Sequence, residues 1–449
     1  MEQRKGRQIV FFPLPLQGHI TPMLQLANIL YTKGFSITII HTHFNSPKPS
    51  NYPHFTFHSI PDALSESDGL NSDLVAVLYH LNTNLVKPFH DCLARLLSED
   101  HKDPIACLIT DAMWQFTQAV ANKHNVPRIV LRTTSICSFL AFAALDLLRE
   151  RGYMPLKDSE LETPVPELPP LRVQDLPEIK TSDLEHFYGL LANVIKETKA
   201  SAGLIWNSYE ELEQDALATS RQVFRIPNFV IGPLNMYFPA ASSSLLSQDK
   251  SCMSWLDKQA PNSVLYVSFG SIAAVSETEF LEIAWGLANS NQPFLWVVRP
   301  GLVRGSEWLE PLPSGFMEML GGRGHIVKWA PQQEVLTHPA TGGFWTHCGW
   351  NSTLECLCEG VPMICQPSFG DQRVNARYIS HVWRVGLHLE YKLERVEIGR
   401  AIKRLMAEKE GEEMRNRIRV LREKTNSLLN QTGSSSQSLE KLVTYILSF

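Results

Sequence analysis

The chain has 449 residues and a formal net charge of −5. This length exceeds one ordinary hydrophobic core, so we expect two domains. The 44% apolar and 19% charged residues are typical of a soluble globular protein, and no basic stripe indicates a nucleic-acid partner. No segment approaches the roughly 20 apolar residues that a membrane-spanning helix needs.

The eight cysteines form neither a C-x-x-C pair nor a zinc-ligand spacing. They also lack the framework pattern of small secreted domains, so we expect a reducing, cytoplasmic location. The N-terminal segment is basic and then apolar, as in a signal peptide. However, its apolar run is short and is interrupted by Pro13 and Pro15, and no small-residue cleavage site follows.

The first predicted elements are a strand, a helix and a second strand. Residues 9–14 form a continuous apolar run, typical of a strand buried on both faces. A loop with His19 follows, and Thr21 and Pro22 would supply the N-cap and first-turn proline of the helix. Residues 35–41 are the next strand. His19 therefore lies beyond the C-terminal end of a strand, where doubly wound sheets bind ligands, although an isolated histidine is more often structural.

A second titratable group follows the apolar run 105–110. Asp111 lies at the end of this predicted strand, before a predicted helix over 114–124. Groups at the ends of parallel strands can meet across a crevice. Asp111 would then accept a hydrogen bond from one nitrogen of an imidazole while the other nitrogen takes a proton from a substrate. The alternative is that Asp111 only caps the helix.

The first half continues with a strand over 126–131 and a Pro-rich, acidic excursion over 152–174, which we expect to border an acceptor pocket. A helix over 183–199 and a strand over 203–207 come next. The Ser, Ala and Pro composition of residues 234–250 predicts an interdomain linker.

The second half restarts the alternation with a buried strand over 263–269. Gly270 and Ser271 follow it, and a helix capped near Ser276 comes after them. Its strand-to-helix position makes Ser271 a candidate for phosphate contact. Strands over 294–298 and 325–329 lead into the most informative segment.

That segment is residues 329–372, WAPQQEVLTHPATGGFWTHCGWNSTLECLCEGVPMICQPSFGDQ. A β-like run over 340–346 leads into a polar loop, a helical pattern, a short apolar strand and a turn. This order is half of a nucleotide-binding α/β unit. Asn351 and Ser352 are good N-cap types, and the free N–H groups and dipole of a helix start favour an anion. His347 would add a donor.

The remaining pattern predicts a helix over 374–382, a strand over 386–390 and an amphipathic helix over 395–408. The charged run 409–424 is more consistent with a solvated helix face than with a binding site. A last helix follows the serines at 434–436.

Residues 329–372 closely resemble the signature box of plant family 1 UDP-glycosyltransferases, with the spacing intact. The resemblance includes FPLPLQGHITPMLQLANIL at the start and WLDKQAPNSVLYVSFGS before the second half's first strand. It is nearest to subgroup 76, and SIPDALSES and FLEIAWGLANSNQPFLWVVRPGL resemble the branch that acts on small hydroxy and aromatic acids.

The resemblance implies an α/β fold of the GT-B type, with two facing Rossmann-like domains and a ligand cleft between them. Residues 1–233 would form the acceptor-binding domain and 251–432 the UDP-sugar-binding domain, joined by the linker 234–250. The tail 433–449 would pack back on the first domain.

The resemblance also implies residue roles in donor binding. Trp329 would stack on the uracil, with Ala330 beside it, and Gln332 and Glu355 would hold the ribose. The groups expected to meet the pyrophosphate are those of His347, Asn351, Ser352 and Ser271. The groups expected to hold the sugar are the Trp350 backbone, Asp371, Gln372 and Thr133. Gln372 is usually associated with UDP-glucose. The alternative for Glu355 and Asp371 is a polar role in a buried core, and for Cys348, Cys356, Cys358 and Cys365 we prefer that core interpretation.

Within this family a histidine in the first loop and an aspartate at this strand end activate the acceptor, and His19 and Asp111 match both places. The implied reaction is an inverting single displacement from UDP-glucose, a co-substrate, without a cofactor. The chain has no Asp-x-Asp motif, so no metal is expected. We expect a monomer that binds a UDP-sugar and a small-molecule acceptor, and neither nucleic acid nor membrane.

The acceptor pocket is less defined. Its candidate walls are Met113, Trp114, Phe139, Leu190 and Leu191, although apolar residues near helix starts are more often core. Arg132 would pair with an acceptor carboxylate or, equally, with a neighbouring acid.

Several alternatives stay open or are weakened by the sequence. Two alternative interpretations replace the hydroxy acid as acceptor. One is N-glucosylation of a cytokinin-like base, and the other is glucosylation of a terpenoid glycoside. A nicotinamide-dependent oxidoreductase would need G-x-G-x-x-G after a first strand, and a serine hydrolase would need G-x-S-x-G; neither motif is present. A non-catalytic sugar-nucleotide sensor is a more distant alternative.

Overall fold

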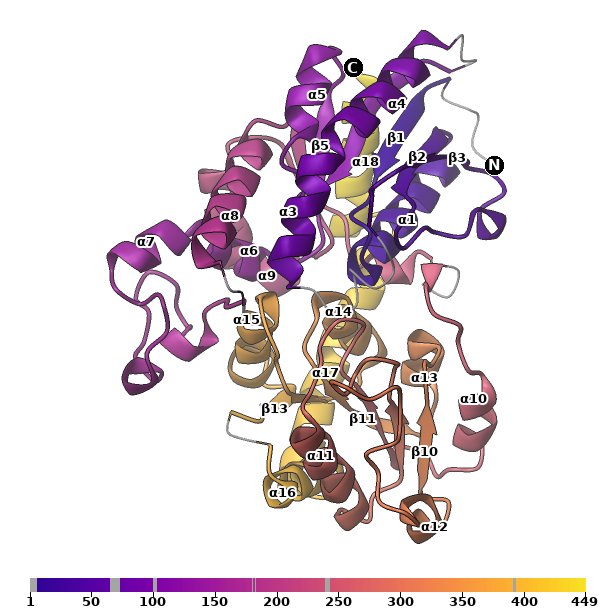
Figure 1. Cartoon of the computed structure of the whole chain (residues 1–449), viewed down its shortest axis with the longest axis vertical. Coiled ribbons are helices and arrows are strands. Elements are labelled where there is room, and N and C mark those ends of the chain that lie inside the picture. Colours follow the sequence, from indigo (N-terminus) through magenta and orange to yellow (C-terminus); the bar gives the residue numbers. More distant parts are fainter. Residues whose placement is uncertain are drawn as a thin grey trace. The chain divides into compact units, whose positions relative to one another are not determined.

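The computed structural model describes residues 6–64, 73–99, 103–179, 181, 183–238, 243–390 and 393–449. The chain divides into two compact units. Unit 1 comprises Met1–Pro155, Ile179–Leu245 and Ser427–Phe449, and unit 2 comprises Leu156–Glu178 and Leu246–Asn426. Each unit is built around its own sheet (Figure 1).

Unit 1 contains a seven-stranded parallel sheet in the order β3-β2-β1-β4-β5-β6-β7. Its strands are β1 (Gln8–Phe12), β2 (Ser36–Thr42), β3 (Thr56–Ile60), β4 (Ile105–Asp111), β5 (Arg128–Arg132), β6 (Gly203–Trp206) and β7 (Asn228–Val230). The central strands β1 and β5 are buried throughout, and β4 is buried except at its first residue, because helices cover both faces of a parallel sheet.

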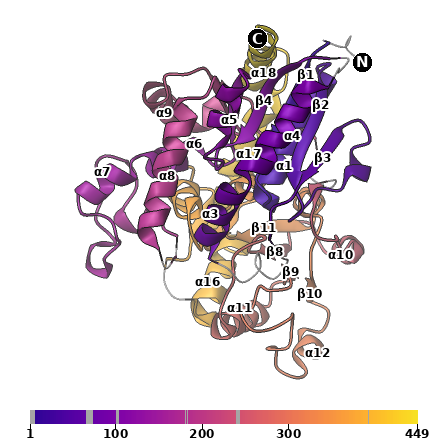
Figure 2. The same cartoon turned by 45° about the horizontal axis from the view of Figure 1, so that its top comes forward.

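The helices of unit 1 are α1 (Gln17–Thr32), α3 (Leu74–Asn84), α4 (Val86–Ser98), α5 (Thr117–Lys123), α6 (Ile136–Ala143), α7 (Leu145–Glu150), α8 (Leu184–Lys199), α9 (Glu210–Val223) and α18 (Ser434–Leu447), with short 3₁₀ turns η1 (Pro49–Asn51) and η4 (Leu234–Met236). The C-terminal helix α18 lies among the N-terminal elements of this unit (Figures 1 and 2). Its apolar face joins the core of β1, β2 and α1 through Leu439, Leu442, Val443 and Ile446. Ser435 Oγ also donates to Gly232 O at 2.6 Å.

Unit 2 contains a six-stranded parallel sheet in the order β10-β9-β8-β11-β12-β13. Its strands are β8 (Val264–Ser268), β9 (Phe294–Val297), β10 (Gly324–Val327), β11 (Thr341–Thr346), β12 (Met363–Cys365) and β13 (Gly386–His388). Its helices are α10 (Ser251–Leu256), α11 (Glu277–Asn289), α12 (Phe316–Leu320), α13 (Gln332–Thr337), α14 (Trp350–Glu359), α15 (Asp371–Arg377), α16 (Arg395–Met406) and α17 (Lys409–Leu428, whose last two residues fall in unit 1), with η2 (Asp158–Glu160), η3 (Val173–Asp175) and the π-helical turn η6 (Tyr378–Val382). Helices α11 and α16 lie side by side (Figure 2).

Each sheet has one point at which the strand order reverses. In unit 1 it falls between β1 and β4, and in unit 2 between β8 and β11. The connections after these strands leave in opposite directions, so the ends of the two strands border a crevice in which such sheets bind ligands. The predicted α/β class with two Rossmann-like domains is therefore confirmed.

The predicted start of the first helix is wrong. Helix α1 begins at Gln17, with Leu16 as its N-cap, so His19 lies in the first helical turn and Thr21 is inside the helix. The reason is not local in sequence. The side-chain amide of Gln17 donates to Ser243 O at 3.0 Å and accepts from Leu245 N at 2.7 Å, so a segment more than 220 residues away fixes this turn.

The units also differ from the predicted boundaries. Residues 156–178, which we expected in the first domain, belong to unit 2. Part of the predicted linker belongs to unit 1, because Leu234, Tyr237, Phe238 and Leu245 pack on its core. Residues 239–242 of that linker and residues 1–5 of the N-terminal segment lie outside the described residues.

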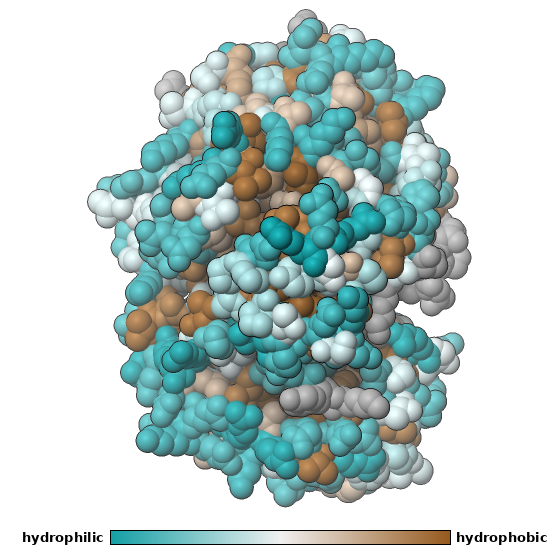
Figure 3. Space-filling view, turned by 90° about the vertical axis from the view of Figure 1, so that its left-hand side faces the viewer, coloured by the Kyte–Doolittle hydropathy of each residue, from teal (hydrophilic) through white to brown (hydrophobic). Residues whose placement is uncertain are grey.

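The surface in the view of Figure 3 carries hydrophobic side chains interspersed among hydrophilic ones. Among the described residues, no helix is both long enough and apolar enough to cross a bilayer.

Candidate functional site

A histidine and an aspartate meet at the strand-order reversal of unit 1. His19 Nδ1 lies 2.7 Å from Asp111 Oδ2. The His19 side chain is 23% exposed and the Asp111 side chain only 1%, so the acid is inside the protein and the imidazole reaches its surface. Asp111 Oδ1 accepts from Met113 N at 2.9 Å, which leaves the carboxylate fixed on both oxygens. Such a pair orients the imidazole and presents Nε2 to a substrate.

The alternative that Asp111 caps the next helix is wrong. Helix α5 begins at Thr117, and its N-cap is Phe116. Asp111 instead ends β4 and closes a two-residue turn onto Met113 N. Its carboxylate is therefore available for His19.

Thr133, one residue after β5, is close to the same imidazole. Its Oγ1 lies 3.1 Å from His19 Nδ1. The resemblance implies that Thr133 contacts the donor sugar; within unit 1 its hydroxyl contacts the His19 ring. The neighbouring Arg132 places its guanidinium 4.2 Å from the centre of the Phe139 ring and donates to Thr134 Oγ1 at 3.1 Å.

The residues proposed as pocket walls divide into two groups. Trp114 and Phe139 have no exposed surface, and Trp114 stacks on Phe12 at 4.6 Å and donates to Phe12 O at 3.1 Å. These contacts favour the core alternative for both aromatic residues. Leu190 and Leu191 are buried on α8, while Met113 is half-buried, with its sulfur 3.5 Å from an Arg132 nitrogen.

In unit 2, glycines surround the ring of His347 where β8 and β11 end. A Cβ on Gly270 or on Gly349 would lie 2.5 Å from His347 Nε2, closer than real contacts allow. Gly270 also has φ +74°, a conformation that favours glycine. Although His347 keeps some exposed surface, burial and, to a smaller extent, the nearby Arg299 together lower the pKa of its ring to about 4. The imidazole is therefore neutral near pH 7 and offers one N–H donor.

Helix α14 begins directly after this ring. The residue types of Asn351 and Ser352 suggested that one of them is the N-cap. The N-cap is instead Gly349, and both residues lie in the first turn of the helix. The first N–H groups of a helix have no carbonyl partner within it, and they are the donors of an anion site. The preceding Cys348 has φ +65°, and its N–H donates to Thr346 Oγ1 at 3.1 Å. A non-glycine residue in this conformation indicates a turn held by its surroundings.

A buried carboxylate of α14, that of Glu355, lies beside the side-chain amide of Gln332. Gln332, the first residue of α13, donates to Glu355 Oε2 at 2.6 Å and to Ser352 Oγ at 3.0 Å. Burial raises the pKa of Glu355 to about 7, although the hydrogen bond from Gln332 lowers the pKa in part. Tyr266 OH donates to Gln332 Oε1 at 3.3 Å. The structure thus brings together the two residues that the resemblance assigns to the ribose.

Trp329 and Ala330 lie between β10 and α13, with Ala330 buried and Trp329 partly exposed. The Trp329 carbonyl accepts from Asp249 N at 2.8 Å. Ser271 follows the loop of Gly270 after β8 and is half-buried.

Asp371 and Gln372 begin helix α15. Gln372 Oε1 accepts from Ser368 N at 2.8 Å and from Phe369 N at 3.2 Å, so its side chain fixes the turn before the helix. Asn375 Nδ2 donates to Cys348 O at 3.0 Å and to Asp371 Oδ2 at 3.2 Å. The start of α15 is therefore tied to the turn before α14.

Sequence reasoning missed two supporting residues. Asn375 lies four residues after Asp371, and this helical spacing was a usable signal. Arg299 is 5% exposed and donates to the carbonyls of Gly270, at 3.1 Å, and Ala273, which holds the loop of Ser271 in place. An arginine at the end of a buried strand gave no local hint of these partners.

Among the residues that the structure describes, no group of three or more His, Cys, Asp or Glu side chains is arranged to hold a metal ion. The expectation that the reaction needs neither metal nor cofactor stays a prediction. The eight cysteines are free and buried, including the four in the segment 329–372.

Two Rossmann-like domains with polar groups at their strand-order reversals define the GT-B class of glycosyltransferases. A family model described as UDP-glucoronosyl and UDP-glucosyl transferase matches residues 89–422. The chain belongs to this family and is a UDP-glycosyltransferase.

Individual relatives agree with this assignment. The chain is similar to UDP-glycosyltransferase 76B1 of Arabidopsis thaliana, with 57% identity over 450 residues and full coverage of both chains. It is 54% identical to UDP-glycosyltransferase 76C1 of the same plant, over 99% of this chain and 97% of that one. The predicted likeness to subgroup 76 is confirmed. Among solved structures, UGT2 of Phytolacca americana complexed with UDP-2fluoro-glucose and pterostilbene superposes with a TM-score of 0.82 at 28% identity, covering 98% of this chain and 99% of that one.

Proposed function

We propose that this enzyme is an inverting glucosyltransferase that moves glucose from UDP-glucose to a hydroxyl or carboxyl group of a small plant metabolite, such as a hydroxy acid or a salicylate-like defence compound. The proposal rests on the contact of 2.7 Å between His19 Nδ1 and Asp111 Oδ2. This contact holds one ring nitrogen of His19 and leaves Nε2 as a base for an acceptor proton.

In the proposed reaction the acceptor O–H bond breaks and its proton moves to His19 Nε2. The oxygen forms a bond to the anomeric carbon from the face opposite UDP, while the bond from that carbon to the diphosphate oxygen breaks and UDP leaves with the electron pair. The buried carboxylate of Asp111 stabilises the imidazolium that forms.

The donor is assigned to unit 2. We propose that Trp329 stacks on the uracil, beside Ala330, and that Gln332 and Glu355 hold the ribose. The start of α14, through Asn351 and Ser352, would meet the diphosphate together with Ser271 and the neutral His347. The Trp350 backbone would meet a sugar hydroxyl. Asp371 and Gln372 would bind the glucose hydroxyls. A relative with the same fold is complexed with UDP-2fluoro-glucose, which supports a UDP-sugar donor.

The experiment is a mass-spectrometric screen with UDP-glucose and four acceptor classes: small hydroxy acids, phenolics, cytokinins and terpenoid glycosides. For each acceptor that gains a hexosyl group, kcat is then measured for the wild type and for His19→Ala. Removal of a general base is expected to lower kcat for O-glucosylation by roughly 10²–10⁴-fold.

A matched control is His90→Ala on α4, because His90 also lies beside an aspartate, Asp91, and its side chain is 26% exposed. This control should retain wild-type kcat. Nearly full activity of His19→Ala would contradict the proposed base and would favour N-glucosylation, in which the acceptor proton matters less. Donor binding without turnover of any acceptor would favour a sugar-nucleotide sensor.

A further inference from the structure

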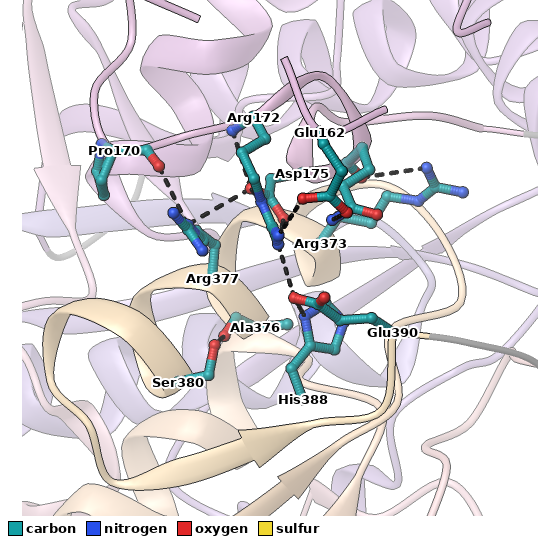
Figure 4. Close-up of polar contacts among 11 residues, drawn as sticks. Glu162, Pro170, Arg172, Asp175, Arg373, Ala376, Arg377, Ser380, His388 and Glu390 are labelled. Atoms are coloured by element: carbon teal, nitrogen blue, oxygen red, sulfur yellow. Dashed lines mark hydrogen bonds and ion pairs between the residues drawn. The ribbon is translucent and has the colours of Figure 1, made fainter. Parts of the chain in front are cut away.

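The segment Leu156–Glu178, here called the strap, interrupts unit 1. The chain leaves unit 1 after Pro155, passes through unit 2 and returns to unit 1 at Ile179. The strap contains the 3₁₀ turns η2 and η3 and an isolated antiparallel bridge between Pro164 and Arg172. It contacts the part of unit 2 that carries α15 and β13 (Figure 4).

An arginine and a buried aspartate organise the strap itself. Arg172 Nε and one terminal nitrogen contact the two oxygens of Asp175 at 3.0 and 3.1 Å, while Arg172 N donates to the same carboxylate at 2.9 Å. The Asp175 side chain is 1% exposed. Two-pronged contact of this kind fixes both side chains in orientation as well as in distance.

The same arginine joins the strap to the sheet of unit 2. Arg172 also lies 2.7 Å from Glu390, just after β13, and 2.9 Å from Glu162 of the strap (Figure 4). The side chain of Arg172 is 13% exposed and that of Glu390 25%, so this ion pair is screened less than a surface ion pair, whereas Glu162 is 68% exposed.

Two arginines of α15 connect the helix to the strap. Arg377 Nε donates to Pro170 O at 3.0 Å and lies 3.5 Å from Asp175. Arg373 lies 2.6 Å from Glu178 and donates to Gln174 O at 3.4 Å. These contacts start in the first turn of α15 and end at its last residue, so the strap holds the helix over its whole length (Figure 4).

The strap also contacts the backbone immediately before Asp371. Gly370 N donates to Glu178 O at 2.7 Å. Gly370 has φ +62°, so this turn is in a conformation that glycine favours. Helix α15 continues directly into η6, and even the combined helical segment 371–382 is only marginally stable by its own hydrogen bonds, so its placement depends on tertiary contacts such as these.

From this geometry we propose that the strap positions Asp371 and Gln372, and that Arg373 and Arg377 are therefore positioning residues for the sugar half of the donor. The inference rests on the proposed function, in which Asp371 and Gln372 bind the glucose hydroxyls. The first turn of α15 carries these two side chains. The strap contacts Gly370, directly before that turn, and Arg373 and Arg377 within the helix. Loosening the strap shifts the sugar contacts and leaves the contacts to UDP in place.

The test compares two ligands that differ only in the sugar. For Arg373→Met and Arg377→Met, the Kd of UDP is measured by calorimetry, and the KM of UDP-glucose is measured with a saturating acceptor. We expect the Kd of UDP to stay within about twofold of the wild type. The KM of UDP-glucose should rise by about tenfold, less than the ~10²-fold that a displacement of 1 Å can cost. The ratio of kcat/KM for UDP-glucose to that for UDP-galactose should also change.

Arg400→Met is the matched control, because Arg400 lies on α16 of the same unit and forms its ion pair with Glu397 on its own helix. It should leave both constants unchanged. If the strap variants weakened the binding of UDP and of UDP-glucose equally, the whole donor site would be loosened and the proposal would be overturned. An unchanged KM of UDP-glucose would also overturn it. If Arg373→Met does not fold, Glu178→Gln removes the charge of its partner and is measured in the same way.

Asp371→Asn separates this inference from the proposed function. If it raises the KM of UDP-glucose while the strap variants match the wild type, the strap has no positioning role and the donor assignment stands. If Asp371→Asn leaves the KM unchanged, the assignment of Asp371 to the sugar fails, and the inference about the strap fails with it.

Discussion

The two units have the same order of strands around their reversal points but carry different chemistry there. In unit 1, β1 and β4 are followed by a partly exposed histidine bonded to a buried aspartate. In unit 2, β8 and β11 are followed by glycines, a histidine and a helix start. The same arrangement of strands thus presents a His–Asp pair that can move a proton in unit 1. In unit 2 it presents mainly backbone N–H groups that can bind an anion.

The two histidines illustrate the difference. His19 Nδ1 lies 2.7 Å from the Asp111 carboxylate, which fixes the orientation of the ring. His347 lies close to two glycine backbones, and burial together with Arg299 lowers its pKa to about 4. A histidine near the strand-order reversal is therefore suited to general-base chemistry in unit 1 and to neutral donation in unit 2, although His19 follows β1 and His347 follows β11, the counterpart of β4. Fold alone does not assign the chemistry; the neighbours of each side chain do.

The largest expected effect is a loss of kcat in a variant of unit 1 that leaves UDP binding, assigned to unit 2, unchanged. Asp111→Asn should lower kcat by roughly 10²–10⁴-fold, because an amide orients the wrong tautomer of His19 and does not stabilise the imidazolium. The Kd of UDP, measured by calorimetry, should not change. Asp91→Asn, which alters a carboxylate beside His90 on α4, is the control. A parallel loss of UDP affinity would contradict the division of roles between the units.

A second prediction concerns the stability of unit 1. Leu442 on α18 is fully buried in the core of this unit, so Leu442→Ala should lower the free energy of unfolding by about 2–5 kcal/mol. Denaturant unfolding measures the change. Leu447→Ala, at an exposed position of the same helix, should have little effect. If the two variants were equally stable, the packing of α18 in this core would be wrong.

The glycines of unit 2 give a third prediction. Gly270→Ala places a methyl group 2.5 Å from His347 Nε2 and forces a side chain onto a backbone with φ +74°. Strain of about 1–3 kcal/mol is expected, with a rise of roughly 10–100-fold in the Kd of UDP. Gly399→Ala is the control, since no atom lies within 4 Å of its added carbon. Unchanged UDP affinity in Gly270→Ala would remove this loop from the proposed donor site.

The smallest effect is a pH dependence of donor binding. Because the pKa of Glu355 is raised to about 7 by burial, its carboxylate becomes ionised, and a better acceptor for ribose hydroxyls, as pH rises from 6 to 8. The KM of UDP-glucose should fall by up to about tenfold over this interval. Glu355→Gln should remove that dependence, and a retained dependence would place the titrating group elsewhere.

The same group affects stability in the opposite direction. Between its ordinary pKa of 4.5 and about 7, Glu355 holds a proton in the folded protein that it has released in the unfolded chain. The free energy of unfolding therefore loses this contribution as pH rises through that interval, and the contribution is fully present below it. Denaturant unfolding at pH 5 and pH 8 should show a smaller pH effect for Glu355→Gln than for the wild type.

Local patterns were sufficient for much of the fold. The buried strands were visible as apolar runs, and the predicted helix cap at Ser276 is confirmed, with Glu279 completing a capping box. Asp111 was placed at a strand end correctly. The start of α1 was not predictable, because Gln17 bonds to residues 243 and 245, and no pattern near Gln17 records those partners.

The sequence by itself determined the alternation of strands and helices, the two restarts of that alternation and the residue types at each strand end, because these depend on periodicity and on neighbours along the chain. Tertiary structure alone decided that the hydroxyl of Thr133 contacts the imidazole of His19, 114 residues away, and that the strap belongs to unit 2. It also decided that Arg172 pairs with Glu390, 218 residues away. Hydrogen bonds and ion pairs act over a few ångströms in space, and chain folding alone brings such distant groups within that range.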